Sequence, residues 1–410
     1  MMVKVKETIK NYLMINLRRF HILLEIIAIW ISKHFLPIKK NVVIFRSTPD
    51  FSDNARALAE YMIDNNYTDF YKIYFDVGNP QYFKNKYSNY PICFFSSTNT
   101  DGTHKLSSLI VLYTANYLMS THEMIINRDA GRKNQHFIRL WHGCSYKDRS
   151  SRDGRIIRNF DIALVPGPLF IKTKAYFWNV DEKYILAKGY PRYDWLLKKD
   201  ERTMRFIHKY KKNQDSKIVL WMPTYRVDKN GIFNDTKEIV NFPILQHKQE
   251  WILIDNYCKE KNIVLLVKLH PFQKQYNIPF DTFDSIIEID NNDLEEVDIQ
   301  LYSLLSLIDA LITDYSSVAF DFLLVDKPIG FTLDDYEEYK DSRGFIFDNP
   351  LDYMPGHHMY NINDMKCFFE DVSQQRDYYK EKRNKVRTIA ISPSNNYCLD
   401  LLEYLNIRKQ

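Results

Sequence analysis

The chain has 410 residues, of which 45% are hydrophobic and 26% are charged, so it is long enough for two domains with separate cores and has a globular composition. Its formal net charge of +4 is too small to indicate nucleic acid as a partner. The five cysteines lack the spacing of a zinc site or a disulfide framework, which favours reduced thiols in the cytosol.

Residues 1–40 form an arm that differs from the rest of the chain. Charged residues and histidines interrupt its apolar residues, so each apolar run is much shorter than the ~20 residues that span a bilayer. A small-residue cleavage site does not follow, so we do not expect a cleaved signal peptide. The arm's excess of lysine and arginine predicts an amphipathic helix lying on an anionic membrane surface. The alternative is a basic helix docked on its own domain.

From residue 41 onward, short apolar runs alternate with helical patterns, which is typical of α/β domains with largely parallel sheets. We expect a first domain at 41–197, a charged linker at 198–216, a second domain at 217–390 and a C-terminal helix at 391–410. The expected strands are 42–45, 71–77, 117–120, 137–140 and 161–165, followed by 218–222, 263–268, 286–289, 310–312 and 328–331. The sequence therefore predicts two open α/β domains that face one cleft.

Polar motifs follow several of these strands, where open parallel sheets bind their ligands. A lone histidine after a strand is usually structural, but several reactive residues at successive strand ends indicate a functional site. The motifs are Leu140-Trp141-His142-Gly143, Met222-Pro223-Thr224-Tyr225-Arg226, Lys268-Leu269-His270-Pro271 and Thr313-Asp314-Tyr315-Ser316-Ser317.

In their order and spacing, these motifs resemble the CDP-glycerol glycerophosphotransferase family of teichoic acid and capsule polymerases. Two further segments belong to the same match, which covers roughly residues 40–390: Gly189-Tyr190-Pro191-Arg192-Tyr193-Asp194 and Arg343-Gly344-Phe345. The resemblance implies a GT-B-like fold of two Rossmann-like domains and a CDP-glycerol or CDP-ribitol donor. It also implies a lipid-linked polyol-phosphate or saccharide acceptor and peripheral attachment to the cytoplasmic face of the cell membrane.

The resemblance leaves several alternatives open. A GT-B glycosyltransferase that uses a nucleotide sugar, or a non-catalytic member that binds polymer, would have the same architecture. The donor polyol and the oligomeric state cannot be read from the motifs. Cys144 stands where the family commonly has threonine, so a hydroxyl contact at that position is in doubt.

On the acceptor side, His142 is the candidate general base because imidazole titrates near neutrality. Its alternatives are a direct phosphate contact or a hydrogen bond that only orients the loop. His270 suits the donor phosphates or the leaving group, and its alternative is a buried histidine bonded to backbone. A basic loop that follows His142 is expected to hold a polyanionic acceptor, or else to be solvated. The acceptor-side candidates are Trp141, Gly143, Lys147 and Arg149.

On the donor side, the hydroxyls and amides of Ser316 and Ser317 at a helix start are expected to bind the pyrophosphate, with simple helix capping as the alternative. Arg226 and Lys268 are expected to supply fixed positive charge, with a surface ion pair as the alternative. Asp314 is expected to cap the helix or contact the ribose, and Asp321 to contact the ribose or solvent. Arg343 and Gly344 are expected to set the shape of the donor loop. The chain has no DxD triplet, Walker A loop or GxGxxG motif. We therefore expect neither a metal site nor an obligatory cofactor, while an effect of Mg²⁺ in solution stays open.

Overall fold

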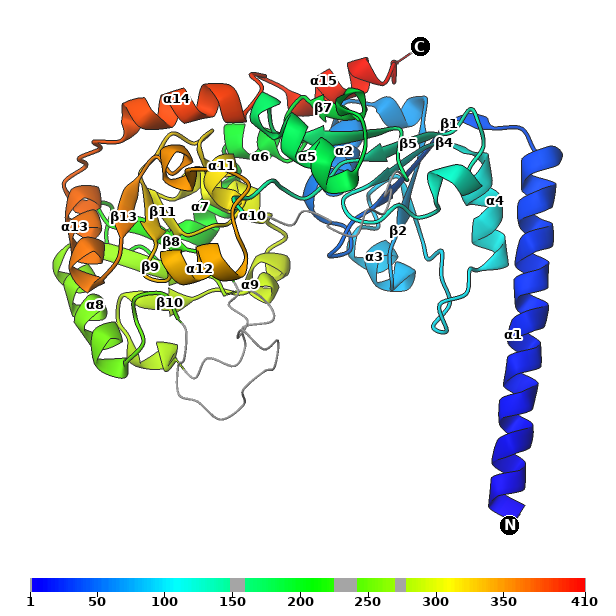
Figure 1. The fold of residues 1–410 in the computed structure, drawn as a ribbon, viewed down its shortest axis with the longest axis horizontal. Helices are drawn as coiled ribbons and strands as arrows, with labels where there is room; N and C mark the ends of the chain where they lie inside the picture. The colour runs from blue at the N-terminus through cyan, green and yellow to red at the C-terminus, as the bar shows by residue number, and fades with distance from the viewer. Residues whose placement is uncertain (1, 148–158, 225–241, 270–277, 410) are drawn as a thin grey trace.

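The computed structural model describes residues 2–147, 159–224, 242–269 and 278–409. Its first element is the long helix α1 (Met2–His34), which stands at one edge of the molecule (Figure 1). Among the helices of the described residues, none has the length and apolar character needed to cross a membrane.

The first domain is built on a parallel sheet with the strand order β3-β2-β1-β4-β5-β6-β7. The strands are β1 (Lys39–Arg46), β2 (Lys72–Asp76), β3 (Ile92–Phe95), β4 (Ala115–Ser120), β5 (His136–Arg139), β6 (Ile162–Val165) and β7 (Ile185–Ala187). Its α-helices are α2 (Asp53–Asp64), α3 (Pro80–Lys86), α4 (Leu106–Thr114), α5 (Ile171–Trp178) and α6 (Tyr193–Leu197). The central strand β1 is buried from Val42 to Phe45, as expected for a sheet covered on both faces.

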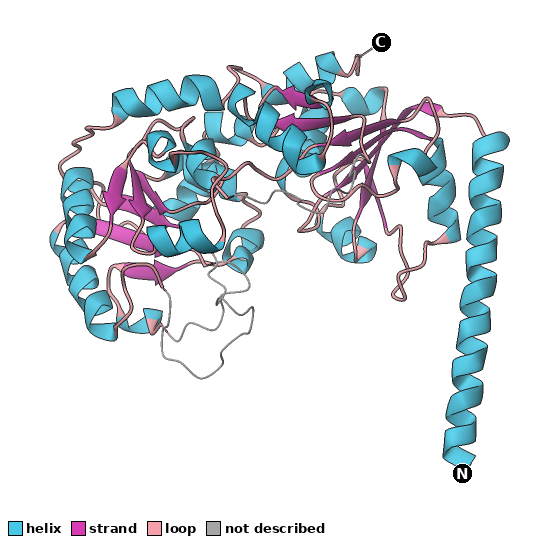
Figure 2. Cartoon of the chain, viewed as in Figure 1, coloured by secondary structure: helices cyan, strands magenta, loops and turns pink. Residues whose placement is uncertain are grey.

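The second domain contains another parallel sheet, with the order β10-β9-β8-β11-β12-β13 (Figure 2). The strands are β8 (Lys217–Trp221), β9 (Ile263–Val267), β10 (Ile286–Glu288), β11 (Ala310–Thr313), β12 (Ile329–Thr332) and β13 (His357–Met359). Its α-helices are α8 (Lys248–Glu260), α9 (Asn291–Glu296), α10 (Leu301–Leu307), α11 (Val318–Phe322), α12 (Tyr336–Ser342) and α13 (Ile362–Ser373). The predicted pair of parallel α/β domains is therefore confirmed.

Three strands of these sheets were not predicted from the sequence. They are β3, β7 and β13, which form edges of the two sheets. Each has only three or four residues, which is too short for a periodic pattern to stand out from a loop.

The expected linker at 198–216 contains a helix, α7 (Glu201–His208). Asp200 accepts a hydrogen bond from the Thr203 amide at 2.9 Å and so caps the helix start. Thr203, Phe206 and Ile207 are buried at helical spacing, and α7 contacts α10. Much of the charge of segment 198–216 thus lies on the exposed face of an amphipathic helix, and the role of this segment as the linker stays a prediction.

The C-terminal segment returns from the second domain to the first. Helix α14 (Lys380–Ala390) reaches the short turn at Pro168–Phe170, and α15 (Tyr397–Tyr404) contacts α2 and α6. The Asp194 carboxylate accepts hydrogen bonds from the amides of Tyr397 and Cys398 at 2.7 and 3.0 Å. In Figure 1, α14 and α15 run along the top of the molecule from one sheet to the other.

Candidate active site between the two domains

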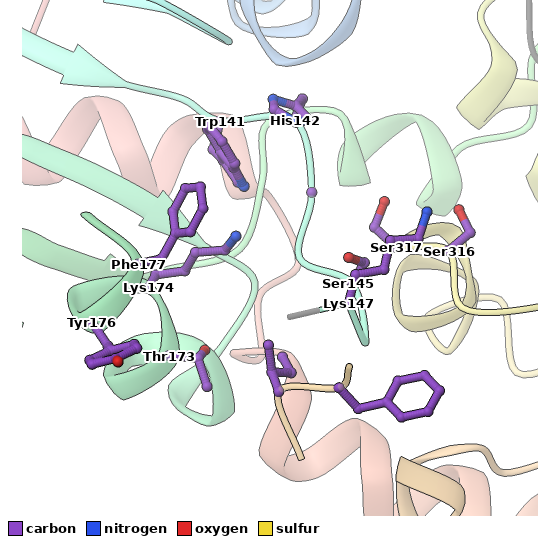
Figure 3. A pocket seen from close by; sticks show the side chains of 13 residues that line it. Trp141, His142, Ser145, Lys147, Thr173, Lys174, Tyr176, Phe177, Ser316 and Ser317 are labelled. Carbon is purple, nitrogen blue, oxygen red and sulfur yellow. The ribbon is translucent and has the colours of Figure 1, made fainter. Parts of the chain in front are cut away.

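Residues of both domains line a cavity of about 280 Å³. From the first domain come Trp141, His142, Gly143, Ser145 and Lys147, together with Thr173, Lys174, Tyr176 and Phe177 of α5; from the second come Ser316, Ser317, Phe345 and Ile346. Figure 3 shows Ser316 and Ser317 on the side of the cavity opposite α5. The segments after β5 and β11 thus meet at one site, as expected for the carboxyl ends of parallel strands.

The loop after β5 has an unusual backbone that brings it against the second domain. Trp141 has a φ of +57°, and the Asn54 side-chain amide donates to the Trp141 carbonyl at 2.8 Å. Gly143 has a φ of +135°, and a Cβ atom added there would lie 2.6 Å from Ser317 Oγ. Glycine therefore permits both the backbone conformation and the close approach of the two domains.

The imidazole of His142 is held on three sides. Its Nδ1 lies 3.4 Å from the Thr121 carbonyl oxygen, and its ring centroid is 4.1 Å from that of His122 and 4.0 Å from that of Trp141. A carbonyl only accepts hydrogen bonds, so this contact favours the tautomer with the proton on Nδ1. Nε2 then carries the lone pair that a general base needs.

Burial lowers the pKa of His142 to about 3, and the neighbouring His122 adds to the shift. The ring is therefore neutral near pH 7. Because His142 has a lower pKa in the folded chain than the ordinary 6.5, the unfolded chain binds the proton more tightly. The stability that the neutral ring contributes is present above about pH 6.5 and is lost as the pH falls towards 3.

We expect this titration to appear in the pH dependence of unfolding. Between pH 7 and pH 5, the wild type should lose on the order of 1 kcal/mol more unfolding free energy than His142→Gln, which has no group that titrates there. Urea denaturation of both proteins at the two pH values measures the difference. Equal losses in the two proteins would contradict the depressed pKa.

Arg192 connects the histidine loop to both domains. It is 2% exposed, and its Nη1 donates to the His142 carbonyl at 3.0 Å and to Asp53 Oδ1 at 2.6 Å. Its Nη2 donates to Asp321 Oδ2 in the second domain at 2.7 Å. Arg192 belongs to one of the matched motifs, but its sequence position alone did not indicate these partners.

Asp321 lies elsewhere than predicted. It is fully buried, and besides Arg192 it accepts hydrogen bonds from the hydroxyls of Tyr193 and Tyr302. Both carboxylate oxygens are thus bound by protein groups, so the structure differs from the expected contact with ribose or solvent. The reason is that α11 packs against the other domain, which the sequence of α11 does not reveal.

Asp314 is also fully buried and accepts a hydrogen bond from the Thr224 amide at 2.7 Å and another from the Thr224 hydroxyl. It therefore holds the segment after β8 against the segment after β11. Ser317 precedes α11, and within the described residues its hydroxyl makes no capping hydrogen bond. Ser317 thus lines the cavity, and its side chain does not cap α11 as the alternative interpretation expected.

Lys268 directly follows β9 and is only 7% exposed. Its Nζ lies 2.5 Å from Asn291 Oδ1, and burial lowers its pKa. In the described part of the chain, the lining of the cavity does not include Lys268. Three other predicted site residues lie outside the described residues: Arg149, Arg226 and His270.

The segment after α12 shapes one wall of the cavity. Gly344 has a φ of +72°, the exposed Arg343 precedes it, and the Ile346 amide donates to the Tyr146 carbonyl at 2.9 Å. A β-bridge also pairs Phe345 with Lys147. Arg343 and Gly344 thus directly precede the two residues that line this wall, Phe345 and Ile346.

Helix α5 contributes a wall that the sequence analysis missed. Lys174 Nζ lies 4.9 Å from the Trp141 ring centroid and 4.7 Å from that of Phe177. Tyr176 on the same helix is 72% exposed at the cavity. Helix α5 carries no recognisable motif, so only its position after β6 could have indicated it.

Within the described residues, no group of three or more His, Cys, Asp or Glu side chains is placed to hold a metal ion. Cys144 is buried, and its Sγ lies 3.5 Å from the Tyr190 hydroxyl. Burial raises the pKa of this thiol, which keeps it protonated.

Two Rossmann-like domains with a cavity between them form a GT-B-like fold. The sequence profile of the CDP-Glycerol:Poly(glycerophosphate) glycerophosphotransferase family matches residues 29–393. The chain belongs to this family.

Individual relatives agree with this membership. The teichoic acid poly(ribitol-phosphate) polymerase of Bacillus spizizenii is 29% identical over 240 residues, which cover 55% of this chain but only 36% of the relative. The teichoic acid poly(glycerol phosphate) polymerase of the same organism is 28% identical over 338 residues, 76% of this chain and 79% of the relative. The structure of the wall teichoic acid polymerase TagF aligns over 99% of this chain and 98% of its own, with a TM-score of 0.73 and 22% identity, and so shows the same fold.

Proposed function

We propose that the chain transfers glycerol phosphate, or a related alditol phosphate, from a CDP-alditol to a hydroxyl of a lipid-linked teichoic acid or capsule-type acceptor. The observation that carries this proposal is the approach of the His142 loop to Ser317 across the interdomain cavity. A base on the first domain and hydroxyl groups on the second thus line one space. Family membership and the named polymerases support CDP-glycerol or CDP-ribitol as the donor.

In the proposed reaction, His142 Nε2 accepts the proton of the acceptor hydroxyl. The hydroxyl oxygen forms a bond to the phosphorus that carries the alditol. The bond between that phosphorus and the oxygen bridging to CMP breaks, and CMP leaves with the electron pair. Positioning of the two substrates by both domains supplies much of the rate enhancement in reactions of this kind.

Nucleotide release tests the reaction class. We expect CMP to form from CDP-glycerol or CDP-ribitol only when an acceptor is present. Release of a nucleoside diphosphate from a nucleotide sugar, with no CMP from either CDP-alditol, would instead establish a glycosyltransferase. A folded chain that binds acceptor polymer and releases no nucleotide would be a non-catalytic member of the family.

We also propose that α1 attaches the enzyme to the cytoplasmic face of the membrane. One face of α1 docks on the first domain, where Glu25 Oε1 accepts from the His104 amide at 2.6 Å and Arg132 Nη1 donates to the Leu36 carbonyl, which follows the helix, at 2.7 Å. Large apolar side chains on α1 and just after it remain exposed: Leu17, Phe20, Ile22, Leu23, Ile26, Ile27, Trp30, Ile31 and Phe35. The basic residues of the arm add attraction for anionic headgroups.

Replacing both Phe20 and Trp30 by serine should weaken binding to anionic vesicles by about 10-fold or more, because each side chain loses an apolar contact with lipid. Phe20 is 59% exposed and Trp30 is 52% exposed, so the substitutions should leave the fold intact. Tyr378→Ser, at a site that is 69% exposed and lies between α13 and α14, is the matched control. Vesicle co-sedimentation measures the effect, and equal binding by both variants would refute the role of α1.

A further inference from the structure

We infer that His122 is a positioning residue for the His142 imidazole in the transfer reaction. This inference rests on the proposed function. It goes beyond it by assigning a role to a histidine that belongs to none of the matched motifs and does not line the described cavity.

The geometry of the two histidines carries the inference. Their ring centroids are 4.1 Å apart and their planes differ by only 8°, so one face of His142 is covered by a parallel ring. Trp141 contacts His142 with a centroid distance of 4.0 Å and an interplanar angle of 39°. Because His142 contacts both of these rings, the orientation of its imidazole plane is restricted.

His122 is itself held just after β4, which ends at Ser120. The Thr121 hydroxyl lies 3.0 Å from His122 Nδ1, and the Thr121 carbonyl faces His142 Nδ1. Strand β4 lies beside β1, where the strand order of the first sheet changes direction. Two consecutive residues therefore act on His142: the Thr121 carbonyl favours the tautomer with the proton on Nδ1, and the His122 ring restricts the ring plane. Nε2 then remains unprotonated and can accept the proton of the acceptor hydroxyl.

The surroundings of His122 favour its neutral form. Burial lowers the pKa of His122, Arg139 and Arg192 act in the same direction, and Asp53 and Glu123 oppose them. A neutral His122 presents a π face to the imidazolium that forms when His142 takes the proton, whereas a protonated His122 would repel it. The two imidazoles therefore titrate as a coupled pair, and protonation of the pair at acid pH should abolish turnover.

Two substitutions separate the stacking of His122 on the His142 ring from the effect of its titration. His122→Phe keeps a flat ring against His142 and should retain most of the turnover. His122→Ala removes the ring and should lower kcat by about 10-fold to 100-fold, with little change in KM for the donor. In His122→Phe, the acid limb of the kcat profile should move to higher pH, because His122 no longer helps to lower the pKa of His142.

A second readout does not depend on turnover. In protein labelled with ¹⁵N-histidine, the ring nitrogens of His142, assigned by comparison with His142→Asn, should show the Nδ1-protonated tautomer in the wild type and in His122→Phe. In His122→Ala they should show averaging of the two tautomers. Wild-type protein that has this tautomer but releases no CMP would refute the proposed function and leave the positioning role standing.

Three results would overturn the inference. One is an unchanged kcat in His122→Ala, and another is an equal loss in the Phe and Ala variants while both unfold at the wild-type temperature. The third is an unchanged His142 spectrum in His122→Ala. If His122→Ala fails to fold, the acid limb of His122→Phe decides the question, and an acid limb that does not move refutes the coupling.

Discussion

Substitution of His142 by asparagine should lower turnover by about 10²-fold to 10⁴-fold, the usual contribution of a general base. Asparagine retains an amide that can donate to the Thr121 carbonyl, so the loop should keep its shape, but it cannot accept the hydroxyl proton. Donor affinity should stay close to that of the wild type, because the substitution alters proton transfer and leaves the second-domain wall intact. Acceptor-dependent CMP release and donor titration calorimetry measure the two quantities.

The matched control for this substitution is His208→Asn, which changes an exposed histidine on α7. It should leave both turnover and affinity unchanged. If His142→Asn retains wild-type turnover, His142 only orients its loop and another group accepts the proton. If donor affinity falls together with turnover, His142 contacts the donor phosphate directly.

Gly143→Ala is expected to have the second large effect. Its added Cβ would lie 2.6 Å from Ser317 Oγ and 2.8 Å from Ser317 Cβ, and the backbone φ of +135° is itself unfavourable for alanine. The loop must then move away from the second domain. We expect a loss of about 1–3 kcal/mol in unfolding free energy and at least a ~100-fold loss of turnover, since small displacements of reacting groups cost this much.

Gly102→Ala provides a control that isolates the contact. Gly102 has a φ of +81°, but nothing lies within 4 Å of an added Cβ, so alanine there has the backbone strain without the collision. Gly143→Ala should lower CMP release by ~100-fold or more, whereas Gly102→Ala should leave it unchanged. The double variant with Ser317→Gly should regain the part of the stability that the collision removes; equal stability of the single and double variants would show that Ser317 does not touch the loop.

The central strands of both sheets were predictable because their buried runs are long enough to stand out, as for β1 and β9. The short edge strand β13 was missed, and its residues His357 and His358 do not resemble a buried strand. Helix α7 was missed because its charged face dominates the composition of the segment.

The site was predictable only in part. The motifs around His142 and Ser317 stood out in the sequence, but their contact depends on how the two domains pack. The same holds for Asp321, whose partner Arg192 lies 129 residues away in the chain. Residues such as Tyr176 line the cavity from α5, a helix without a motif, and only the fold places them there.

The most direct test of the account is the chemical identity of the product formed by the purified chain. With CDP-glycerol or CDP-ribitol and a lipid-linked acceptor, we predict a new phosphodiester signal in the ³¹P spectrum. One CMP should be released for each alditol phosphate added, and the signal should be absent with His142→Asn. Acceptor that gains no phosphodiester from either donor, although the chain is folded and binds it, would contradict the proposed transfer.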